Sequence, residues 1–327
     1  MRKKNNKGTK TSTFGVGKRE QHDSSLFYNS KLYGDVKINE NAEELQNIIN
    51  PNYLDKVICA DSKNLDFLPD SSVHLMVTSP PYNVSKVYDE DLSLNEYKDL
   101  LEGVFSETYR VLVSGGRVCI NIANVGRKPY IPYHRYIMEV MEKIGFIMRG
   151  EIIWDKNASA GVSTAWGSWQ SASNPVLRDV HEYILIYSKD KLGRKRKNRN
   201  NTITKEQFLE YTKSIWSFPA ESAKKVGHPA PFPVELPFRC IQLYTFENDV
   251  VLDPFCGVGT TNIAAIMSNR HHIGIDNNIE YIEKGRKRIE NYLLEQSQTS
   301  ISKFAYTCCT SSCSSRVSIN DKTCLAS

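Results

Sequence analysis

The sequence predicts an α/β fold built on a mostly parallel, doubly wound sheet. Strand-like and helix-like segments alternate over residues 57–189, and the same alternation returns over residues 228–295. Near residue 250 a buried strand runs through small residues into a helix. The chain has 327 residues, of which 40% are hydrophobic, which is enough for one large core and a small second lobe.

In the first α/β block, short apolar strands flank one long helix. Residues 56–61 (KVICAD) form a β-branched run that ends in an acid, and residues 74–82 (HLMVTSPPY) form an apolar strand that must stop at its double proline. Residues 93–112 place apolar side chains at helical spacing behind a serine cap. A turn at residues 114–116 leads into a strand over residues 117–123.

The second α/β block repeats the pattern in a shorter space. Residues 249–255 (DVVLDPF) predict a buried strand, which enters the loop CGVGTT and then a helix over residues 262–269. Residues 272–277 (HIGIDN) predict the next strand. A strand, a glycine-containing loop and a helix in this order are typical of sheets that bind ligands at the carboxyl ends of their strands.

Shifts in composition divide the chain into five parts. We expect an N-terminal segment over residues 1–49, a first α/β half over residues 50–189, and a basic, loop-like segment over residues 190–227. A second α/β half follows over residues 228–296. Residues 297–327 are rich in Ser, Thr and Cys and lose periodicity, which predicts a poorly ordered tail.

The first chemical motif is DPFCGVGTT, residues 253–261. Gly257 and Gly259 let the backbone approach a ligand, and free amides at the helix start can hold a carboxylate. S-adenosylmethionine (AdoMet) carries such a carboxylate, and Asp276, at the end of the next strand, is placed to bind ribose hydroxyls. A generic mononucleotide loop or a plain tight turn is the alternative, but a Walker loop is excluded because no Gly-Lys-Ser/Thr follows.

The second motif is TSPPYN, residues 78–83. An enzyme that methylates an exocyclic amine must take the base out of the duplex and accept the hydrogens of that amine. The Ser79 hydroxyl and the Pro80 carbonyl are candidate acceptors, and Tyr82 offers a ring for stacking on the base. A proline turn that ends a strand would explain the motif alone, but the two motifs together favour amine methylation.

Both motifs resemble those of the DNA amino-methyltransferases of restriction–modification systems, in their permuted (beta) group. There the catalytic block precedes the AdoMet-binding block, as TSPPYN precedes DPFCGVGTT here. The resemblance spans residues 57–290 and a block at residues 14–28, and includes the segment VHEYILIYSK at residues 180–189. It implies the Rossmann-like fold of AdoMet-dependent methyltransferases with a circularly permuted motif order and a small basic target-recognition insertion at residues 190–227.

The resemblance also implies roles for individual residues. The catalytic set would be Ser79, Pro80, Pro81 and Tyr82. Asp61 would contact the AdoMet adenine, and Phe232 and Pro233 would flank its methionine part. The implied cofactor-binding set is Asp61, Phe232, Pro233, Asp253, Pro254, Phe255, Gly257, Gly259, Thr260, Thr261 and Asp276.

The choice of target base rests partly on chemistry and partly on the resemblance. Methylation of cytosine carbon-5 needs a nucleophilic thiolate, normally from a Pro-Cys dipeptide, and the sequence has none. In the resembling family, serine before Pro-Pro-Tyr usually accompanies cytosine N4 methylation, and Asp or Asn there usually accompanies adenine N6 methylation. Ser79 therefore favours cytosine N4, with adenine N6 as the alternative. An RNA or protein-glutamine methyltransferase and a non-catalytic DNA-binding protein are the more distant alternatives.

The expected substrate is double-stranded DNA. The resemblance to the family also implies that the enzyme is a monomer and is paired with a restriction endonuclease of the same specificity. The basic run at residues 189–199 coincides with the family's target-recognition region and predicts phosphate contacts. Trp166 and Trp169 could stack near the extruded base, although core burial would explain them equally. The predicted DNA-contact residues are Arg194, Lys195, Arg196, Lys197, Arg199, Trp166 and Trp169.

Composition sets the remaining bounds. A net charge of +5 permits a nucleic-acid partner without requiring one. No apolar run is long enough to cross a membrane and the N-terminus lacks a secretory stretch, so we expect a cytoplasmic protein. In-line methyl transfer needs no metal, and neither the histidines nor the eight cysteines show metal-ligand spacing.

Overall fold

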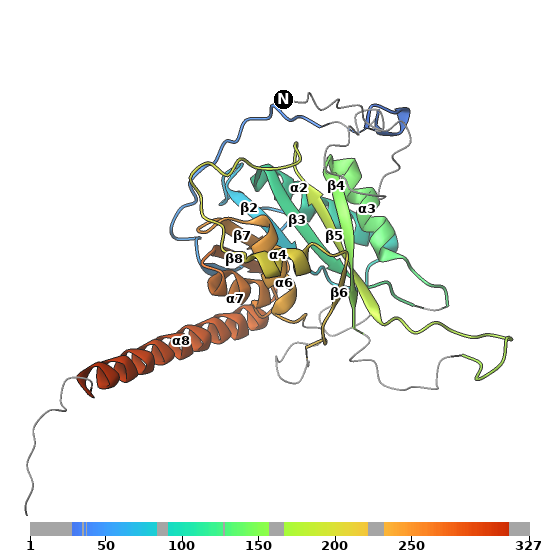
Figure 1. The fold of residues 1–327 in the computed structure, drawn as a ribbon. Coiled ribbons are helices and arrows are strands. Elements are labelled where there is room, and N and C mark those ends of the chain that lie inside the picture. Colours follow the sequence, from blue (N-terminus) through green and yellow to red (C-terminus); the bar gives the residue numbers. More distant parts are fainter. Residues whose placement is uncertain are drawn as a thin grey trace, which may run out of the picture.

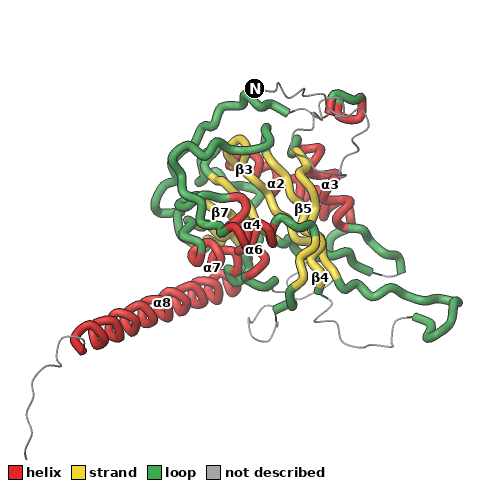
Figure 2. The backbone as a smooth tube through the Cα atoms, viewed as in Figure 1, coloured by secondary structure: helices red, strands yellow, loops and turns green. Residues whose placement is uncertain are grey.

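A computed structural model describes residues 28–34, 36, 38–83, 91–126, 128–156, 167–221 and 232–313, with side chains described as far as residue 298. Within these residues the chain folds around one eight-stranded sheet in the order β1-β8-β7-β2-β3-β5-β4-β6 (Figure 1). Most of its strand pairs are parallel, and helices cover both faces (Figure 2). The predicted α/β class is therefore confirmed.

The elements of the first part follow the predicted alternation. They are η1 (Lys31–Tyr33), β1 (Lys56–Cys59), β2 (Val73–Thr78), α2 (Leu94–Val111), β3 (Leu112–Ile122), α3 (Tyr133–Ile144), β4 (Ile147–Asp155) and β5 (His181–Ser188). Helix α2 begins at the predicted place because Ser93 forms a capping box: its hydroxyl accepts from the Glu96 amide while the Glu96 carboxylate accepts from the Ser93 amide.

The second part begins with the short α4 (Lys205–Tyr211) and β6 (Ile215–Ser217). It continues through α6 (Glu235–Tyr244), β7 (Val250–Asp253), α7 (Thr260–Met267), β8 (His271–Asp276) and α8 (Ile279–Cys313). In Figure 1 the far end of α8 projects away from the rest of the fold.

The order of the strands creates a switch point between β2 and β7. These two neighbours run parallel, so their carboxyl ends meet at the same edge of the sheet. Helix α2, which follows β2, packs on one face together with α3, whereas α7, which follows β7, packs on the other face with α6. The connections that follow β2 and β7 therefore go to opposite faces of the sheet. Open α/β sheets bind ligands in the crevice that forms between two such strand ends.

Two buried clusters sandwich the sheet. On the face of α2 and α3, Met76 and Ile120 pack against side chains such as Phe105 and Leu101. On the other face, Val77 packs with residues of α6 and α7. Strand β2 is buried along its whole length, which explains why its sequence is apolar on both faces.

The bounds of β3 and α8 differ from the segments expected from the sequence. Residues 114–116 do not form a separate turn, because they lie within β3, where the register against β2 shifts and Gly115 takes a positive φ of 80°. Helix α8 extends past residue 297 and ends at Cys313. That stretch contains no proline or glycine to end a helix.

Candidate functional site

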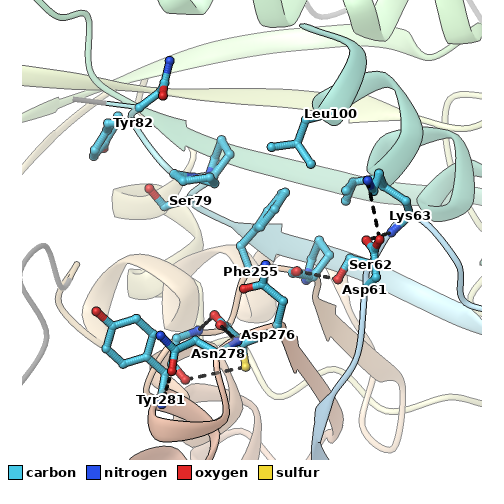
Figure 3. Close-up of a pocket in the computed structure, with 18 of the residues that line it drawn as sticks. Asp61, Ser62, Lys63, Ser79, Tyr82, Leu100, Phe255, Asp276, Asn278 and Tyr281 are labelled. Carbon is cyan, nitrogen blue, oxygen red and sulfur yellow. Dashed lines mark hydrogen bonds and ion pairs between the residues drawn. The ribbon is translucent and has the colours of Figure 1, made fainter. Parts of the chain in front are cut away.

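A cavity of about 340 Å³ lies at the switch point between β2 and β7. This size falls within the range of small-molecule sites. In the view of Figure 3, Ser79 and Tyr82 lie on one side of the cavity, Asp61 and Lys63 on the other, and Phe255 between them. The predicted residues that line it are Asp61, Ser79, Pro80, Pro81, Tyr82, Phe232, Pro254, Phe255, Gly257, Thr260 and Asp276.

The side of the cavity formed by residues 79–83 follows directly from the end of β2. The strand stops at Thr78 because the two prolines that follow Ser79 cannot continue a ladder. The Tyr82 hydroxyl donates to Glu182 on β5 at 3.3 Å. Burial raises the pKa of Tyr82, and the Glu182 carboxylate raises it further, so the phenol stays protonated.

The opposite side is formed by the glycine loop, residues 256–260, between β7 and α7. Gly257 and Gly259 take positive φ angles of 48° and 78°, a conformation that side chains disfavour. The Gly257 amide donates to one oxygen of Asp276 at 2.9 Å, and the Asn278 amide donates to the other at 2.9 Å. Each carboxylate oxygen retains a further lone pair, so Asp276 can still accept hydroxyl donors from a ligand.

Asp61 and its neighbours close the cavity from the loop after β1. The Ser62 hydroxyl donates to the Pro254 carbonyl at 2.7 Å and so ties this loop to the glycine loop. Asp61 accepts from the Lys63 amide at 2.9 Å and remains exposed. Its other carboxylate oxygen lies 3.5 Å from the Lys63 ammonium, in an exposed ion pair at the wall of the cavity.

Asp253 lies beneath the cavity rather than in its wall. Its carboxylate is buried, and one oxygen accepts from the Thr78 hydroxyl at 2.6 Å and from the Phe255 amide at 3.1 Å. Asp253 thereby joins the end of β2 to the loop after β7. Burial raises its pKa to about 6, although these hydrogen bonds oppose the rise.

We predict that Asp253→Asn stabilises the protein at neutral pH by about 1 to 3 kcal/mol, since one pKa unit corresponds to about 1.4 kcal/mol. The folded-state pKa near 6 exceeds the ordinary value of 3.8, so the wild-type carboxyl favours folding below pH 3.8 and loses this contribution as pH rises through 6. Urea denaturation between pH 4 and pH 7.5 measures the difference. The exposed Asp61→Asn is the control, and a variant less stable than wild type at every pH would contradict the prediction.

Several predicted cofactor residues do not line the cavity. Thr261 is buried and donates to the Val77 carbonyl at 3.3 Å, so together with Asp253 it supports the loop from below. Gly259 caps α7, and Pro233 lies just before α6. Asp253 and Thr261 thus support the glycine loop from below, and their direct contact with a ligand stays a prediction.

The cavity is also lined by residues outside the predicted catalytic and cofactor-binding sets. Tyr97, Leu100 and Val104 reach it from α2, and Asn278 and Tyr281 reach it from the start of α8. The apolar residues of α2 follow the same helical spacing as its core residues, so sequence alone assigns them to packing. The other unpredicted lining residues are Ala60, Ser62, Lys63, Asn83, Leu92, Cys256, Val258 and Asn277.

The basic run lies at the opposite edge of the sheet from the cavity. Strand β5 is antiparallel to β3 and ends at Ser188, which pairs with Arg117 near the beginning of the parallel strands. Figure 1 shows the segment after β5 leaving the sheet at the edge opposite to the segment that precedes β5. The run therefore follows an antiparallel strand and leaves the sheet away from the cavity, and its predicted DNA contacts stay a prediction.

The side chains of the run differ in their surroundings. Arg194 is buried in an ion pair with Asp249, the residue before β7, and its guanidinium lies over the Phe246 ring. Arg199 also lies over Phe246, at 4.2 Å. Lys195, Arg196 and Lys197 are exposed. Trp169 lies in the segment before β5 with 66% of its surface exposed, whereas Trp166 lies outside the described residues.

The described part of the chain contains neither a cluster of metal-ligand side chains nor a membrane-spanning helix. No cluster of three or more His, Cys, Asp or Glu side chains there could hold a metal ion. None of its helices is long and apolar enough to span a membrane.

Comparison with known proteins identifies similar chains. Residues 73–287 match the family described as DNA methylase, N6_N4_Mtase. The chain is 35% identical over 266 residues to the type II methyltransferase M.MjaI of Methanocaldococcus jannaschii, covering 68% of this chain and 86% of that protein. It is 29% identical to the type II methyltransferase M.MthZI of Methanothermobacter thermautotrophicus, covering 71% and 76%.

Solved structures share the fold. TTHA0409 from Thermus thermophilus, assigned as a DNA modification methylase, was solved in complex with S-adenosyl-L-methionine. It is 30% identical, covers 71% of this chain with 92% of its own length, and superposes with a TM-score of 0.57. The cytosine-N4-specific PvuII DNA methyltransferase is 20% identical with a TM-score of 0.56, covering 70% of this chain and 84% of its own length, and supports the fold alone.

Proposed function

Because the chain belongs to the DNA methylase family and uses S-adenosylmethionine as its methyl donor, we propose that it methylates the exocyclic N4 amine of cytosine in double-stranded DNA. The observation that carries this proposal is the position of Ser79. It stands at the end of β2, in the same cavity as the glycine loop after β7. Acceptors for an amine and a cradle for a methyl donor thus share one cavity.

AdoMet would supply a methyl group on a positively charged sulfur. Transfer forms a nitrogen–carbon bond as the carbon–sulfur bond breaks, leaving S-adenosylhomocysteine, and the methylated amine releases one proton to water. The residues of the chain hold the two reactants in line, and such positioning is a large part of catalysis. Asp276 binds the ribose hydroxyls and Asp61 contacts the adenine. The amides at the start of α7 bind the carboxylate of the methionine part.

The target base enters from the Ser79 side. Base methylation requires the base to leave the helix stack. The Ser79 hydroxyl and the Pro80 carbonyl accept the two hydrogens of the amine, which turns the nitrogen lone pair toward the methyl group. The Tyr82 ring stacks on the extruded base, and Phe255 lies between this side and the cofactor side.

A charged network behind Tyr82 fixes the orientation of its ring. Glu182 accepts from the Tyr82 hydroxyl at 3.3 Å, from the Asn121 amide at 2.6 Å and from the Lys156 ammonium at 2.5 Å. Its side chain is only 12% exposed. Strands β3, β4 and β5 therefore hold the stacking surface in one position.

We predict that Glu182→Gln lowers kcat about three- to tenfold and leaves AdoMet affinity within twofold, because a charged acceptor is replaced by a weaker neutral one. Single-turnover methylation and calorimetric AdoMet binding measure the two quantities. Tyr82→Phe removes the same contact, so the double variant should be no slower than the slower single variant. Additive losses would show that Glu182 does not act through Tyr82.

We propose that residues near the opening of the cavity contact the DNA. Trp169 is exposed on the segment before β5, where it can reach bases or sugars around an extruded nucleotide. Exposed Lys195, Arg196 and Lys197 would contact phosphates only if the duplex extended to the other edge of the sheet. Pairing with a restriction endonuclease of the same specificity and action as a monomer are part of the same proposal.

The test is to incubate the purified protein with labelled AdoMet and unmethylated bacterial DNA, digest the DNA and identify the modified nucleoside. N4-methylcytosine is the expected product. N6-methyladenine would keep the family and the mechanism but overturn the use of Ser79 as an indicator of the base; the matched family covers both reactions. Absence of label in DNA would overturn the proposal.

A further inference from the structure

One face of α8 packs against the glycine loop. Gly285, Arg288 and Ile289 lie at spacings of three and four residues and so share this face. A Cβ added at Gly285 would lie 3.3 Å from the Val258 carbonyl carbon, and one added at Gly259 would lie 3.4 Å from Ile289. The helix therefore approaches the backbone of the loop closely.

Arg288 binds this loop at two points. Its Nη1 donates to the Thr260 hydroxyl oxygen at 2.9 Å and approaches the Val258 carbonyl at 3.3 Å. Arg288 is half-buried, and its burial lowers the pKa, while the Glu221 carboxylate opposes the decrease. A guanidinium stays charged in proteins, so positive charge is held beside the cavity.

The contact with Thr260 determines what that hydroxyl can do. A guanidinium has only donors, so the Thr260 oxygen must accept from Arg288 and its own hydrogen must point elsewhere. Thr260 lines the cavity and is only 5% exposed. Among the described residues, its hydrogen has no acceptor within hydrogen-bonding distance. The hydrogen is thus available to an acceptor in the cavity.

We propose that Arg288 is a positioning residue for the carboxylate of the methyl donor, acting by turning the Thr260 hydroxyl into a donor that faces the cavity. This rests on the proposed placement of the methionine part at the glycine loop. The Thr260 hydroxyl, the amides at the start of α7 and the charge of Arg288 together select a ligand with a carboxylate at this end. The adenosine end is bound elsewhere, by Asp61 and Asp276.

The experiment compares two ligands that differ at this end. S-adenosylhomocysteine carries the amino-acid group, whereas 5′-methylthioadenosine keeps the adenosine and sulfur and lacks the carboxylate. Titration calorimetry on the full chain measures Kd for both with the wild type and with Arg288→Met. We expect the variant to weaken S-adenosylhomocysteine binding about tenfold or more and methylthioadenosine binding less than threefold.

Arg286→Met is the matched control. Arg286 lies two residues earlier on α8, but its side chain donates to the Val57 carbonyl on β1 at 2.8 Å, away from the loop. This variant should bind both ligands as the wild type does. Arg288→Lys keeps the charge with a different donor geometry and should fall between the wild type and Arg288→Met.

Thr260→Val tests whether Arg288 acts through the hydroxyl. It should produce the same selective loss of S-adenosylhomocysteine, and the double variant with Arg288→Met should lose less than the product of the two single losses. Equal weakening of both ligands by Arg288→Met would show a general collapse of the loop and overturn the inference, as would no weakening of either. A wild type that binds neither ligand would instead overturn the proposed cofactor site.

Discussion

Ser79→Ala should lower the rate of DNA methylation about a hundredfold or more while AdoMet affinity stays within threefold. The hydroxyl is proposed to accept a hydrogen of the target amine, and loss of one oriented polar group at a reacting centre typically costs this much. Ser79 lies on the proposed base side of the cavity, across from Asp61 and Asp276 in Figure 3. Single-turnover transfer of labelled methyl groups at saturating DNA and AdoMet measures the rate.

Ser62→Ala provides the matched comparison. Ser62 lines the same cavity, but its hydroxyl donates to the Pro254 carbonyl on the cofactor side. Its loss should affect AdoMet affinity more than the rate of transfer. If Ser79→Ala transfers methyl groups at a rate within threefold of wild type, the Ser79 hydroxyl does not orient the amine, and the proposal for the base side must be abandoned.

The two segments that meet at the switch point could be recognised from the sequence. A strand must end where Ser79 is followed by two prolines, and a ligand can approach a loop that has glycines at Gly257 and Gly259. Both features act on the backbone within a few residues of their position, so they can be recognised without knowledge of the fold. The cap at Ser93 is of the same kind, and the structure confirms it.

The surroundings of the cavity depend on packing between distant segments, which local patterns do not encode. Glu182 reaches Tyr82 only because β5 pairs with β3, and Arg288 reaches Thr260 only because α8 returns to the loop. Asp253 has the sequence position of a ligand-binding acid, yet its carboxylate accepts a hydrogen bond from Thr78 and so joins β2 to β7. Charge in a basic run likewise says nothing about which edge of a sheet the run follows.

Variants of the basic run therefore test whether its role follows from its location in the fold or from its positive charge. We predict that Arg194→Ala destabilises the protein by about 3 kcal/mol and leaves the DNA affinity of the folded protein within twofold. Breaking a buried ion pair leaves an uncompensated charge, which costs about 3 to 5 kcal/mol. The lower value applies because Arg199 lies 3.8 Å from Asp249 and partly replaces the lost partner. Urea denaturation and fluorescence titration with a DNA duplex measure the two quantities.

In the wild type the imidazole of His74 beside Asp249 is uncharged at neutral pH. Its Nδ1 accepts from the Val250 amide at 2.9 Å, and burial lowers its pKa to about 4, so the imidazole carries no charge beside Asp249. Lys197→Ala is the control, since that side chain is 63% exposed and should contribute less than about 0.5 kcal/mol to stability. If instead both variants weakened DNA binding with a reduced salt dependence and neither changed stability, the run would be a phosphate-contacting surface. Its place at the far edge of the sheet would then require a duplex that spans both edges.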